Sequence, residues 1–385
     1  MKIQNINICF ALAFNCPYAG NTISSLEILS KKLKSNNCNI YWVFPMQKEH
    51  DWIKKIKISD HVIFIKDSYK QATNEFEKIF IENNISLVHS HFEAYDESIA
   101  KACKRIKREI KQVWHVHDYL GYTGNFLNKI RCHFSYFRHY YIYGKQAYLL
   151  PVSEEMAAFC NHYRKGIFFL PVKKNKRRQK NNEYKKSTTI INGIDLSRIH
   201  QELEINIPRN PFIFLTFGGQ AKRKRIDLLV KAGIRLINKG YNIKIRITKG
   251  RDTLQWLTET CKKTDFPWLE IIEQTENIGS LFKECSCYVS TATQETMSMA
   301  IAEATIIGKP VIQSNIEGTW WNAQNPSTYL FQDKNIDDLS KQMEILINTA
   351  NPLIIKNCKI TQENNLKLLN LDLWCNKIIS IYQKI

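Results

Sequence analysis

The segment from Cys285 to Ile312 constrains the fold of this chain more than any other, because it predicts a complete strand, loop, helix and strand unit. The run CSCYVSTAT is apolar and β-branched, which is typical of a buried strand. Small and apolar residues after Glu295 predict a helix that begins just after this residue. Gly308-Lys309-Pro310 ends the helix, and Val311 begins the next strand. Such a unit indicates a parallel sheet covered by helices.

The loop of this unit has the chemistry of an anion site. At the carboxyl edge of a parallel sheet, free backbone amides and the helix dipole favour negative charge. The amides of Met297, Ser298 and Met299 could therefore hold a phosphate. Glu303, about two turns into the expected helix, could accept hydrogen bonds from a ribose diol, while Glu295 would lie near a sugar. One segment would thus bind both ends of a nucleotide sugar.

Glu295 and Glu303 resemble the Glu-x7-Glu motif of retaining GT-B glycosyltransferases, family 4 in particular. Two glutamates at this spacing also occur by chance on solvated helices. Three features favour the family resemblance over chance. These are the flanking strand, the Gly-Lys-Pro-Val segment that ends the helix, and two further family-like segments that occur in the expected order. The resemblance implies an α/β GT-B fold with two Rossmann-like domains facing across a cleft and a last helix that crosses back to the amino-terminal domain.

The length and composition agree with two domains. A chain of 385 residues with 44% hydrophobic content can form two α/β cores. The segment ELEINIPRNP contains two prolines and predicts the boundary. We expect an amino-terminal acceptor-binding domain over 1–205, a nucleotide-sugar-binding domain over 206–368, and a helix over 369–385 that packs back on the first domain.

The charge balance favours anionic partners. The chain has 55 Lys and Arg against 36 Asp and Glu, a net charge of +19, although a Lys-, Asn- and Ile-rich composition from an AT-rich genome would also produce this.

Its 11 cysteines include no Cys-x-x-Cys pair, so neither a disulfide framework nor a zinc knuckle is indicated. No apolar run reaches the length of a membrane span. We therefore expect a cytoplasmic protein.

The amino-terminal half begins with a strand over Ile6 to Phe14, a loop that contains Gly20, and a helix. The resemblance implies that Gly20 approaches the donor phosphates and the acceptor, with the double glycine of the family reduced to Ala19-Gly20. An ordinary turn at the start of a helix is the alternative.

Two histidine pairs end successive strands in this half: His89 with His91, and His115 with His117, which Asp118 follows. Residues two apart in a strand share a face, and imidazoles with a carboxylate are natural metal ligands, so a metallohydrolase is an alternative. No further acidic ligand set has comparable spacing. The resemblance implies that no metal is present and that His117 donates a hydrogen bond to a hydroxyl of the reacting sugar. A purely structural role, with the side chain packed at the end of a strand, suits His89 and His115 better than it suits His117.

A second family-like segment follows a predicted strand in the carboxyl-terminal half, FLTFGGQAKRKRIDLL. It resembles the Gly-Arg-(x)4-Lys-Gly segment whose cations neutralise the leaving diphosphate, and Lys224 is the matching lysine. Gly219 or Gln220 stands where the arginine is expected, and Arg225 replaces the glycine. Arg223 could supply the missing charge from another position, or the cationic clamp could be weaker. A solvent-facing basic turn is the alternative.

Two further segments support the same organisation. TTIINGIDLSRI resembles the Asn-Gly-Ile-Asp motif of the family, at Asn192 to Asp195. NKIRCHFSYFRHYYIYGKQAY alternates basic and aromatic residues, which could bind single-stranded nucleic acid, lie on an anionic membrane surface, or pack as a helix. We favour the membrane surface because RIKREIK and the charge run within Val172 to Lys186 add basic residues to the half that receives the acceptor. No nucleic-acid partner is expected.

The expected reaction transfers a sugar, with retention, from a nucleotide-diphosphate donor to a lipid-linked saccharide during assembly of a polysaccharide such as lipopolysaccharide, O-antigen or capsule. Lys224, Glu295 and His117 would carry it, at the inner face of the cytoplasmic membrane. No metal or cofactor is expected, since no Asp-x-Asp motif is present. The alternatives are a nucleotide-sugar 2-epimerase of the same fold, acting on UDP-GlcNAc, and a degenerate polyanion- or membrane-binding protein.

Overall fold

The computed structural model describes residues 3–69, 71–118, 126–166, 186–199, 205–219, 221–262 and 265–385. The chain forms two compact units, one made of Met1–Gly193 and Leu371–Ile385 and the other of Ile194–Asn370. The expected boundary, between 205 and 206, lies further along the chain than the observed one. Ile205 belongs to the second unit because it packs into the core of that unit together with Ile207.

The first unit contains a six-stranded parallel sheet with the strand order β3-β2-β1-β4-β5-β6. Its strands are β1 (Asn7–Leu12), β2 (Asn39–Pro45), β3 (His61–Ile65), β4 (Ile85–His91), β5 (Lys111–Val116) and β6 (Tyr148–Pro151). The central strands β1 and β4 are buried along almost their whole length, as expected for a parallel sheet with helices on both faces.

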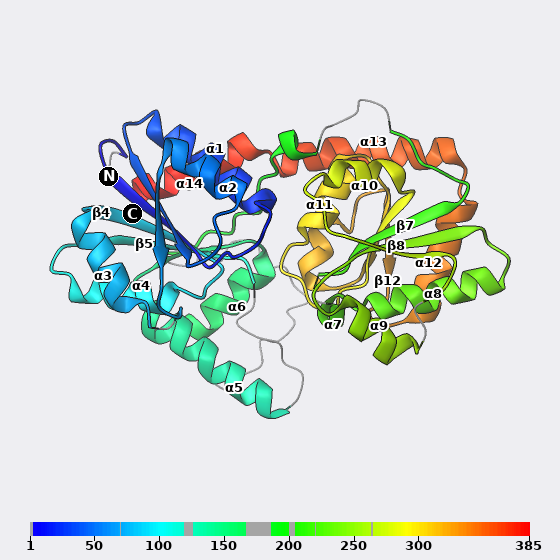
Figure 1. The fold of residues 1–385 in the computed structure, drawn as a ribbon, viewed down its shortest axis with the longest axis horizontal. Helices are drawn as coiled ribbons and strands as arrows, with labels where there is room; N and C mark the ends of the chain where they lie inside the picture. The colour runs from blue at the N-terminus through cyan, green and yellow to red at the C-terminus, as the bar shows by residue number, and fades with distance from the viewer. Residues whose placement is uncertain are drawn as a thin grey trace. The chain divides into compact units, whose positions relative to one another are not determined.

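Helices cover this first sheet. They are α1 (Gly20–Lys34), α2 (Asp51–Ser59), α3 (Thr73–Glu82), α4 (Asp96–Arg105), α5 (Phe126–Phe137), the π-helix η1 (Arg138–Tyr143), α6 (Glu154–Arg164) and α14 (Leu371–Lys384). The last of these, drawn in red, lies against α1, drawn in blue (Figure 1). Leu26 of α1 and Trp374, Ile378 and Tyr382 of α14 share one apolar core. The predicted return of the carboxyl-terminal helix to the amino-terminal domain is confirmed.

The second unit contains another six-stranded parallel sheet, with the order β12-β11-β10-β7-β8-β9. Its strands are β7 (Phe212–Phe217), β8 (Ile243–Thr248), β9 (Leu269–Ile272), β10 (Cys287–Ser290), β11 (Val311–Ser314) and β12 (Thr328–Phe331). Its helices are the 3-10 turn η2 (Leu196–Arg198), α7 (Ala221–Lys224), α8 (Ile226–Asn238), α9 (Thr253–Cys261), α10 (Ile278–Glu284), α11 (Met299–Ile306), the 3-10 turn η3 (Glu317–Asn322), α12 (Ile336–Asn348) and α13 (Asn351–Leu368).

The two sheets share one topology, and this topology positions the functional loops. In each unit the second and third strands lie on one side of the first strand, and the later strands lie on the other side. The direction of winding therefore reverses between β1 and β4, and again between β7 and β10. Ligands of such sheets bind beyond the carboxyl ends of the strands at this point. The two predicted Rossmann-like domains are confirmed.

The start of α11 differs from the prediction. This helix begins at Met299 rather than just after Glu295, because Ser298 has an extended backbone, with a ψ angle of 105°, and is the N-cap. Glu303 therefore lies about one turn into the helix instead of two.

The charge run from Val172 to Lys186, apart from Lys186 itself, lies outside the described residues, and so does Gln220.

Candidate functional site

The candidate residues form two groups, one in each unit. In the second unit, Lys224 is the last residue of the short helix α7, in the connection that follows β7. Its ammonium group forms a salt bridge with the carboxylate of Glu295, in the connection that follows β10. The side chains are only 19% and 7% exposed. Partial burial strengthens such a pair because less water screens the two charges. The predicted catalytic residues Lys224 and Glu295 are thus brought together at the point where the winding reverses.

A close backbone approach holds Glu295 in place. A Cβ atom added to Gly318, in η3, would lie 1.9 Å from the carbonyl oxygen of Glu295. Only glycine permits η3 to lie this close to the loop. A second approach of this kind joins the neighbouring loops, since a Cβ at Gly250 would lie 2.0 Å from the carbonyl oxygen of Gly219. Glycines that were not singled out in the sequence therefore shape the site.

The amino terminus of α11 presents unsatisfied polar groups. Ser298 caps this helix by its backbone alone, and its side chain makes no capping hydrogen bond. The Ser298 hydroxyl is buried, with the residue 2% exposed, and finds no hydrogen-bond partner among the described residues. The buried hydroxyl of Thr293, in the same loop, likewise has no partner in the described part of the chain. Such groups cost about 1–3 kcal/mol each when they stay unpaired. A bound anion would recover this cost.

Met297 and Met299 flank Ser298, so the three predicted amides lie in the last loop residues and the first residue of α11. Glu303 follows in the same helix and is 7% exposed. Both glutamates affect the pKa of the Tyr288 hydroxyl, in β10. Burial raises this pKa most, and the negative charges of Glu295 and Glu303 raise it further. The two acids of the Glu-x7-Glu pair therefore act on one buried tyrosine.

Arg223 and Arg225 differ in their roles. The carbonyl of Arg223 accepts a hydrogen bond from the amide of Thr293 at 3.2 Å, which connects the loop after β7 with the loop after β10. Arg225 has a φ angle of +49°, in the left-handed region that favours glycine, and it stands where the family resemblance places a glycine. Its guanidinium pairs with the buried Asp227 at 3.0 Å. Arg225 thus stabilises the loop through Asp227.

Asp227 was not predicted as a site residue. Besides Arg225, it contacts Lys231 at 3.4 Å and accepts a hydrogen bond from the indole of Trp256 at 3.0 Å. Burial alone would raise the pKa of Asp227, but the hydrogen bonds from Arg225 and Trp256 and the nearby positive charges lower it overall. The aspartate therefore stays ionised and holds the segment that carries Lys224.

In the first unit, His117 lies just beyond the end of β5. Its Nε2 is 2.9 Å from Nδ1 of His91 in β4. Its backbone amide donates to Oε1 of Glu93 at 2.6 Å, and the amide of Asp118 donates to the same oxygen at 3.1 Å. Burial lowers the pKa of His117 to about 3, so the imidazole is neutral at physiological pH. Glu93, which anchors this turn, was not predicted from the sequence.

Gly20 is the first residue of α1 and has a φ angle of +59°. The next residue, Asn21, donates from Nδ2 to the carbonyl of Gly193 at 2.8 Å. Gly193 in turn lies against Leu371 and Trp374 of α14. The Asn-Gly-Ile-Asp motif therefore joins the start of α1 to the start of α14.

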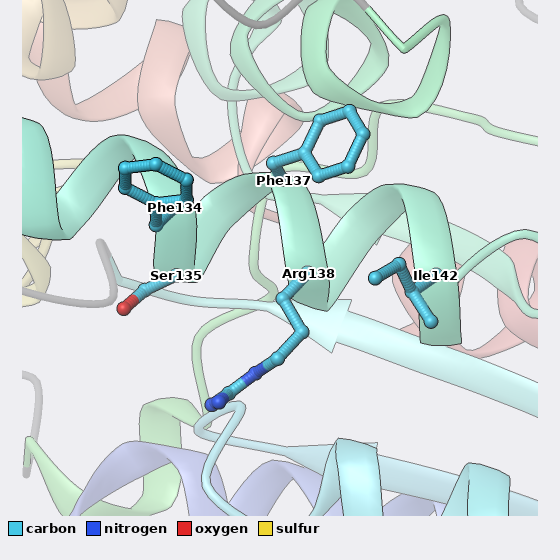
Figure 2. Close-up of a pocket in the computed structure, with 5 residues that line it drawn as sticks. All are labelled: Phe134, Ser135, Phe137, Arg138 and Ile142. Atoms are coloured by element: carbon cyan, nitrogen blue, oxygen red, sulfur yellow. The ribbon is translucent and has the colours of Figure 1, made fainter.

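The basic and aromatic segment of the first unit forms α5 and η1. Its buried side, with Tyr136 and Tyr140, packs into a core. Its other side exposes large apolar and basic side chains, listed here: Ile130, Arg131, Phe134, Arg138, Tyr141, Ile142 and Lys145. Figure 2 shows the pocket on this surface, lined by Phe134, Ser135, Phe137, Arg138 and Ile142. We call this surface the α5/η1 face. Across the described ranges, no helix is both long and apolar enough to cross a membrane.

Comparison with known families gives one match, within the second unit. Residues 198–365 match the model of the family Glycosyl transferases group 1. None of the curated proteins matches the sequence of this chain.

Solved structures extend the similarity to the whole chain. A glycosyltransferase from Rickettsia africae ESF-5 has a TM-score of 0.71 at 15% identity, covering 99% of this chain and 98% of that one. Anabaena HepE in complex with UDP-glucose has a TM-score of 0.74 at 13% identity, with 99% and 100% covered. WaaG, a glycosyltransferase involved in lipopolysaccharide biosynthesis, has a TM-score of 0.70 at 12% identity, with 97% and 99% covered. These similarities confirm the predicted GT-B fold class.

Proposed function

We propose that this protein is a retaining glycosyltransferase that moves a sugar from a nucleotide-diphosphate donor to a hydroxyl of a saccharide acceptor. The group 1 domain over residues 198–365 supports the enzyme class. The observation that carries the proposal is the buried hydroxyl of Ser298, the N-cap residue of α11, because this hydroxyl has no partner among the described residues. It lies in the same connection as Glu295, whose carboxylate holds the ammonium of Lys224. Cation, helix terminus and hydroxyl together suit a diphosphate.

The proposed chemistry is electrostatic. As the bond between the sugar and the diphosphate breaks and the acceptor oxygen bonds to the sugar, the departing phosphate oxygen takes up the proton of the acceptor hydroxyl. Negative charge develops on the diphosphate in this step, and groups already oriented toward it lower the barrier. Lys224 and Arg223 would supply positive charge, and the amides of Met297, Ser298 and Met299 would donate hydrogen bonds at the helix terminus. Gly20 would allow the phosphates to approach the first unit closely. Neither a metal ion nor a cofactor is needed for this step.

The remaining residues position the two substrates. Glu295 would orient the donor sugar, and Glu303 would accept hydrogen bonds from the ribose. His117 would donate a hydrogen bond to a hydroxyl of the reacting sugar. Its neutral imidazole, with a pKa lowered to about 3 by burial, suits a hydrogen-bond donor and not a proton carrier. Paired acid and base carboxylates, as in glycosidases, do not enter the proposal.

We further propose a lipid-linked acceptor in the assembly of lipopolysaccharide, O-antigen or capsule, at the inner face of the cytoplasmic membrane. The α5/η1 face supports this because it combines exposed apolar residues, Phe134 and Ile142 at 57% each, with arginines and a lysine (Figure 2). This composition favours an anionic lipid surface. WaaG, which shares the fold, acts in lipopolysaccharide biosynthesis.

The test is thermal unfolding of the wild type and of Glu303→Ala with UDP-, GDP-, dTDP- and ADP-sugars, with and without magnesium. A ligand that binds only the folded state raises the melting temperature by mass action. We expect one nucleotide class to stabilise the wild type, independently of magnesium, and to lose this effect in the variant. UDP-glucose comes first because HepE binds it. No shift with any nucleotide would contradict the proposal.

Stereochemistry needs a separate measurement. The anomeric proton coupling of the product sugar, followed by NMR from the start of the reaction, is expected to match that of the donor. A product of the opposite anomeric configuration would contradict retention. Turnover of UDP-GlcNAc without any acceptor would instead support the 2-epimerase.

A further inference from the structure

Three wholly buried histidines of the first unit converge between β4 and β5. His91 and His115 are direct neighbours in the parallel register of these strands, and His89 precedes His91 on the same face of β4. The ring centroids are 4.2 Å apart for His89 and His91, 5.0 Å for His91 and His115, and 5.3 Å for His89 and His115. None of the three is more than 1% exposed.

Each of these histidines has a ring nitrogen without a hydrogen-bond partner among the described residues. The unpaired atoms are Nε2 of His89, Nε2 of His91, and both ring nitrogens of His115. Buried polar atoms are paired in the great majority of cases, so several such atoms at one place need an explanation. One ligand atom from each histidine lies within 4.8 Å of the other two. A single ion could therefore contact one nitrogen of each of the three rings.

The second ring nitrogens of His89 and His91 are already held. Nδ1 of His89 lies 2.5 Å from the hydroxyl of Tyr382, in α14, and Nδ1 of His91 lies 2.9 Å from Nε2 of His117. If both Nδ1 atoms carry the proton, they donate these hydrogen bonds and the buried Nε2 lone pairs remain free. A metal-binding histidine commonly has this arrangement, with one nitrogen on the ion and the other donating to a neighbour.

The protonation state agrees with this arrangement. Burial, and the positive charge that neighbouring histidines would carry, lower the pKa of His89, His91 and His115 well below its usual range. Neutral imidazole is the form that binds metal ions.

We propose that His89, His91 and His115 form a binding site for one divalent transition-metal ion of the zinc class. Three imidazole nitrogens suit Zn²⁺ or Co²⁺, whereas Mg²⁺ and Ca²⁺ prefer oxygen ligands. The ion would connect the ends of β4 and β5 and fix His91, which holds His117. The site belongs to the first unit, whereas Lys224 and the amino terminus of α11 belong to the second. Its role is structural, and it takes no part in the proposed sugar transfer.

The experiment is metal analysis of the full chain, produced with added zinc and desalted in the presence of EDTA. We expect about one zinc ion per chain in the wild type. His115→Phe removes two unpaired nitrogens and keeps a flat ring, so we expect it to weaken zinc binding more than about 100-fold, beyond the loss typical of an outer-shell change. His50→Gln, at the start of α2, is the control and should keep the ion.

The cobalt form gives a second measurement. The wild type, freed of metal and loaded with Co²⁺, should show the intense visible absorption of a four-coordinate site, and His115→Phe should not. A wild type without zinc, zinc retained equally by His115→Phe, or a weak octahedral cobalt spectrum would each overturn the proposal. If His115→Phe fails to fold, the zinc content and cobalt spectrum of the wild type decide alone. Stabilisation by nucleotide sugars, measured in parallel, tests the transferase separately.

Discussion

Lys224 and Glu295 form a salt bridge that joins the loop after β7 to the loop after β10. Both side chains are largely buried, so the ammonium of Lys224 is held in one position before any donor binds. A diphosphate at the amino terminus of α11 would offer Lys224 further negative oxygens. Hydrogen bonds between charged groups are the strong ones in such a site. The pair therefore prepares a cation for the leaving group.

Replacement of Lys224 by alanine should weaken the binding of UDP or another matching nucleotide by about 10–100-fold, since a hydrogen bond to a charged group contributes roughly 1.5–3 kcal/mol. Isothermal titration calorimetry measures this change. Lys222 lies on the same helix α7 with an exposed side chain, so Lys222→Ala is the matched control and should bind like the wild type. Equal losses in both variants would mean that only the general charge of the loop matters.

Ser298→Ala should separate stability from binding. In the free protein the Ser298 hydroxyl is buried without a partner among the described residues, so its removal should leave the melting temperature unchanged or slightly higher. The same change should weaken nucleotide binding severalfold, because it removes a donor to the proposed phosphate. Ser314→Ala is the control. Its hydroxyl donates to the carbonyl of Ser290 at 3.3 Å, so this variant should be less stable and should bind normally.

The sequence predicted most of the secondary structure around the site. Apolar, β-branched runs such as FIFLTF and CYVS became β7 and β10, because strands buried on both faces need continuous apolar residues. Ile226, Leu229 and Ala232 have the spacing of one helix face, and all three are buried in α8. The order of the strands depends on contacts between distant segments, which local sequence patterns do not reveal. Only the resemblance to a family predicted it.

Residues that act through distant contacts were missed. Glu93 holds the amide of His117 in the next strand connection, and Gly318 admits the carbonyl of Glu295. Neither partner is near in sequence, so no spacing rule reveals them. The helix start at Met299 was also missed, because small apolar residues after Glu295 suit a helix as well as the extended loop that η3 packs against.

Asp227→Asn should destabilise the protein by on the order of 2 kcal/mol, because it leaves Arg225 without its buried counter-charge. The pKa of Asp227 is lowered in the folded state, so its contribution to stability is present above the unfolded value of 3.8 and is lost as the pH falls through the folded value. The difference in unfolding free energy between wild type and variant should thus be constant from pH 8 to 5 and shrink below pH 4. Chemical denaturation at several pH values measures it. A difference that grows in acid would exclude this role.

The α5/η1 face should bind anionic membranes. Phe134 and Ile142 are each 57% exposed, so their insertion contributes roughly half of the 1.5–3 kcal/mol for full burial, or about 0.8–1.7 kcal/mol apiece. The double change Phe134→Ser with Ile142→Ser should therefore reduce flotation with phosphatidylglycerol vesicles by at least about tenfold. Binding of the wild type should weaken at high salt. Leu353→Ser with Ile345→Ser, exposed in the second unit, is the control. No flotation of the wild type would remove the argument for a membrane-linked acceptor.

Glu303 should recognise the ribose of the donor. Its carboxylate is 7% exposed and lies one turn into α11, whose amino terminus would hold the phosphates. An ionised carboxylate accepts two hydroxyl hydrogen bonds better than a neutral amide does. We therefore expect the wild type to bind UDP more tightly than 2′,3′-dideoxy-UDP, and Glu303→Gln to lose roughly 10-fold or more of this preference.

The comparison of the two nucleotides makes the assignment specific. A variant that is merely less stable would lose affinity for both nucleotides equally, whereas loss of a ribose contact lowers affinity for UDP alone. Glu284→Gln is the matched control, because it makes the same change from carboxylate to amide at the exposed end of α10, outside the loops after β7 and β10. This variant should preserve the wild-type preference for UDP over 2′,3′-dideoxy-UDP. If Glu303→Gln also preserves it, the carboxylate of Glu303 does not contact the ribose, and its proximity to Tyr288 is then a matter of packing alone.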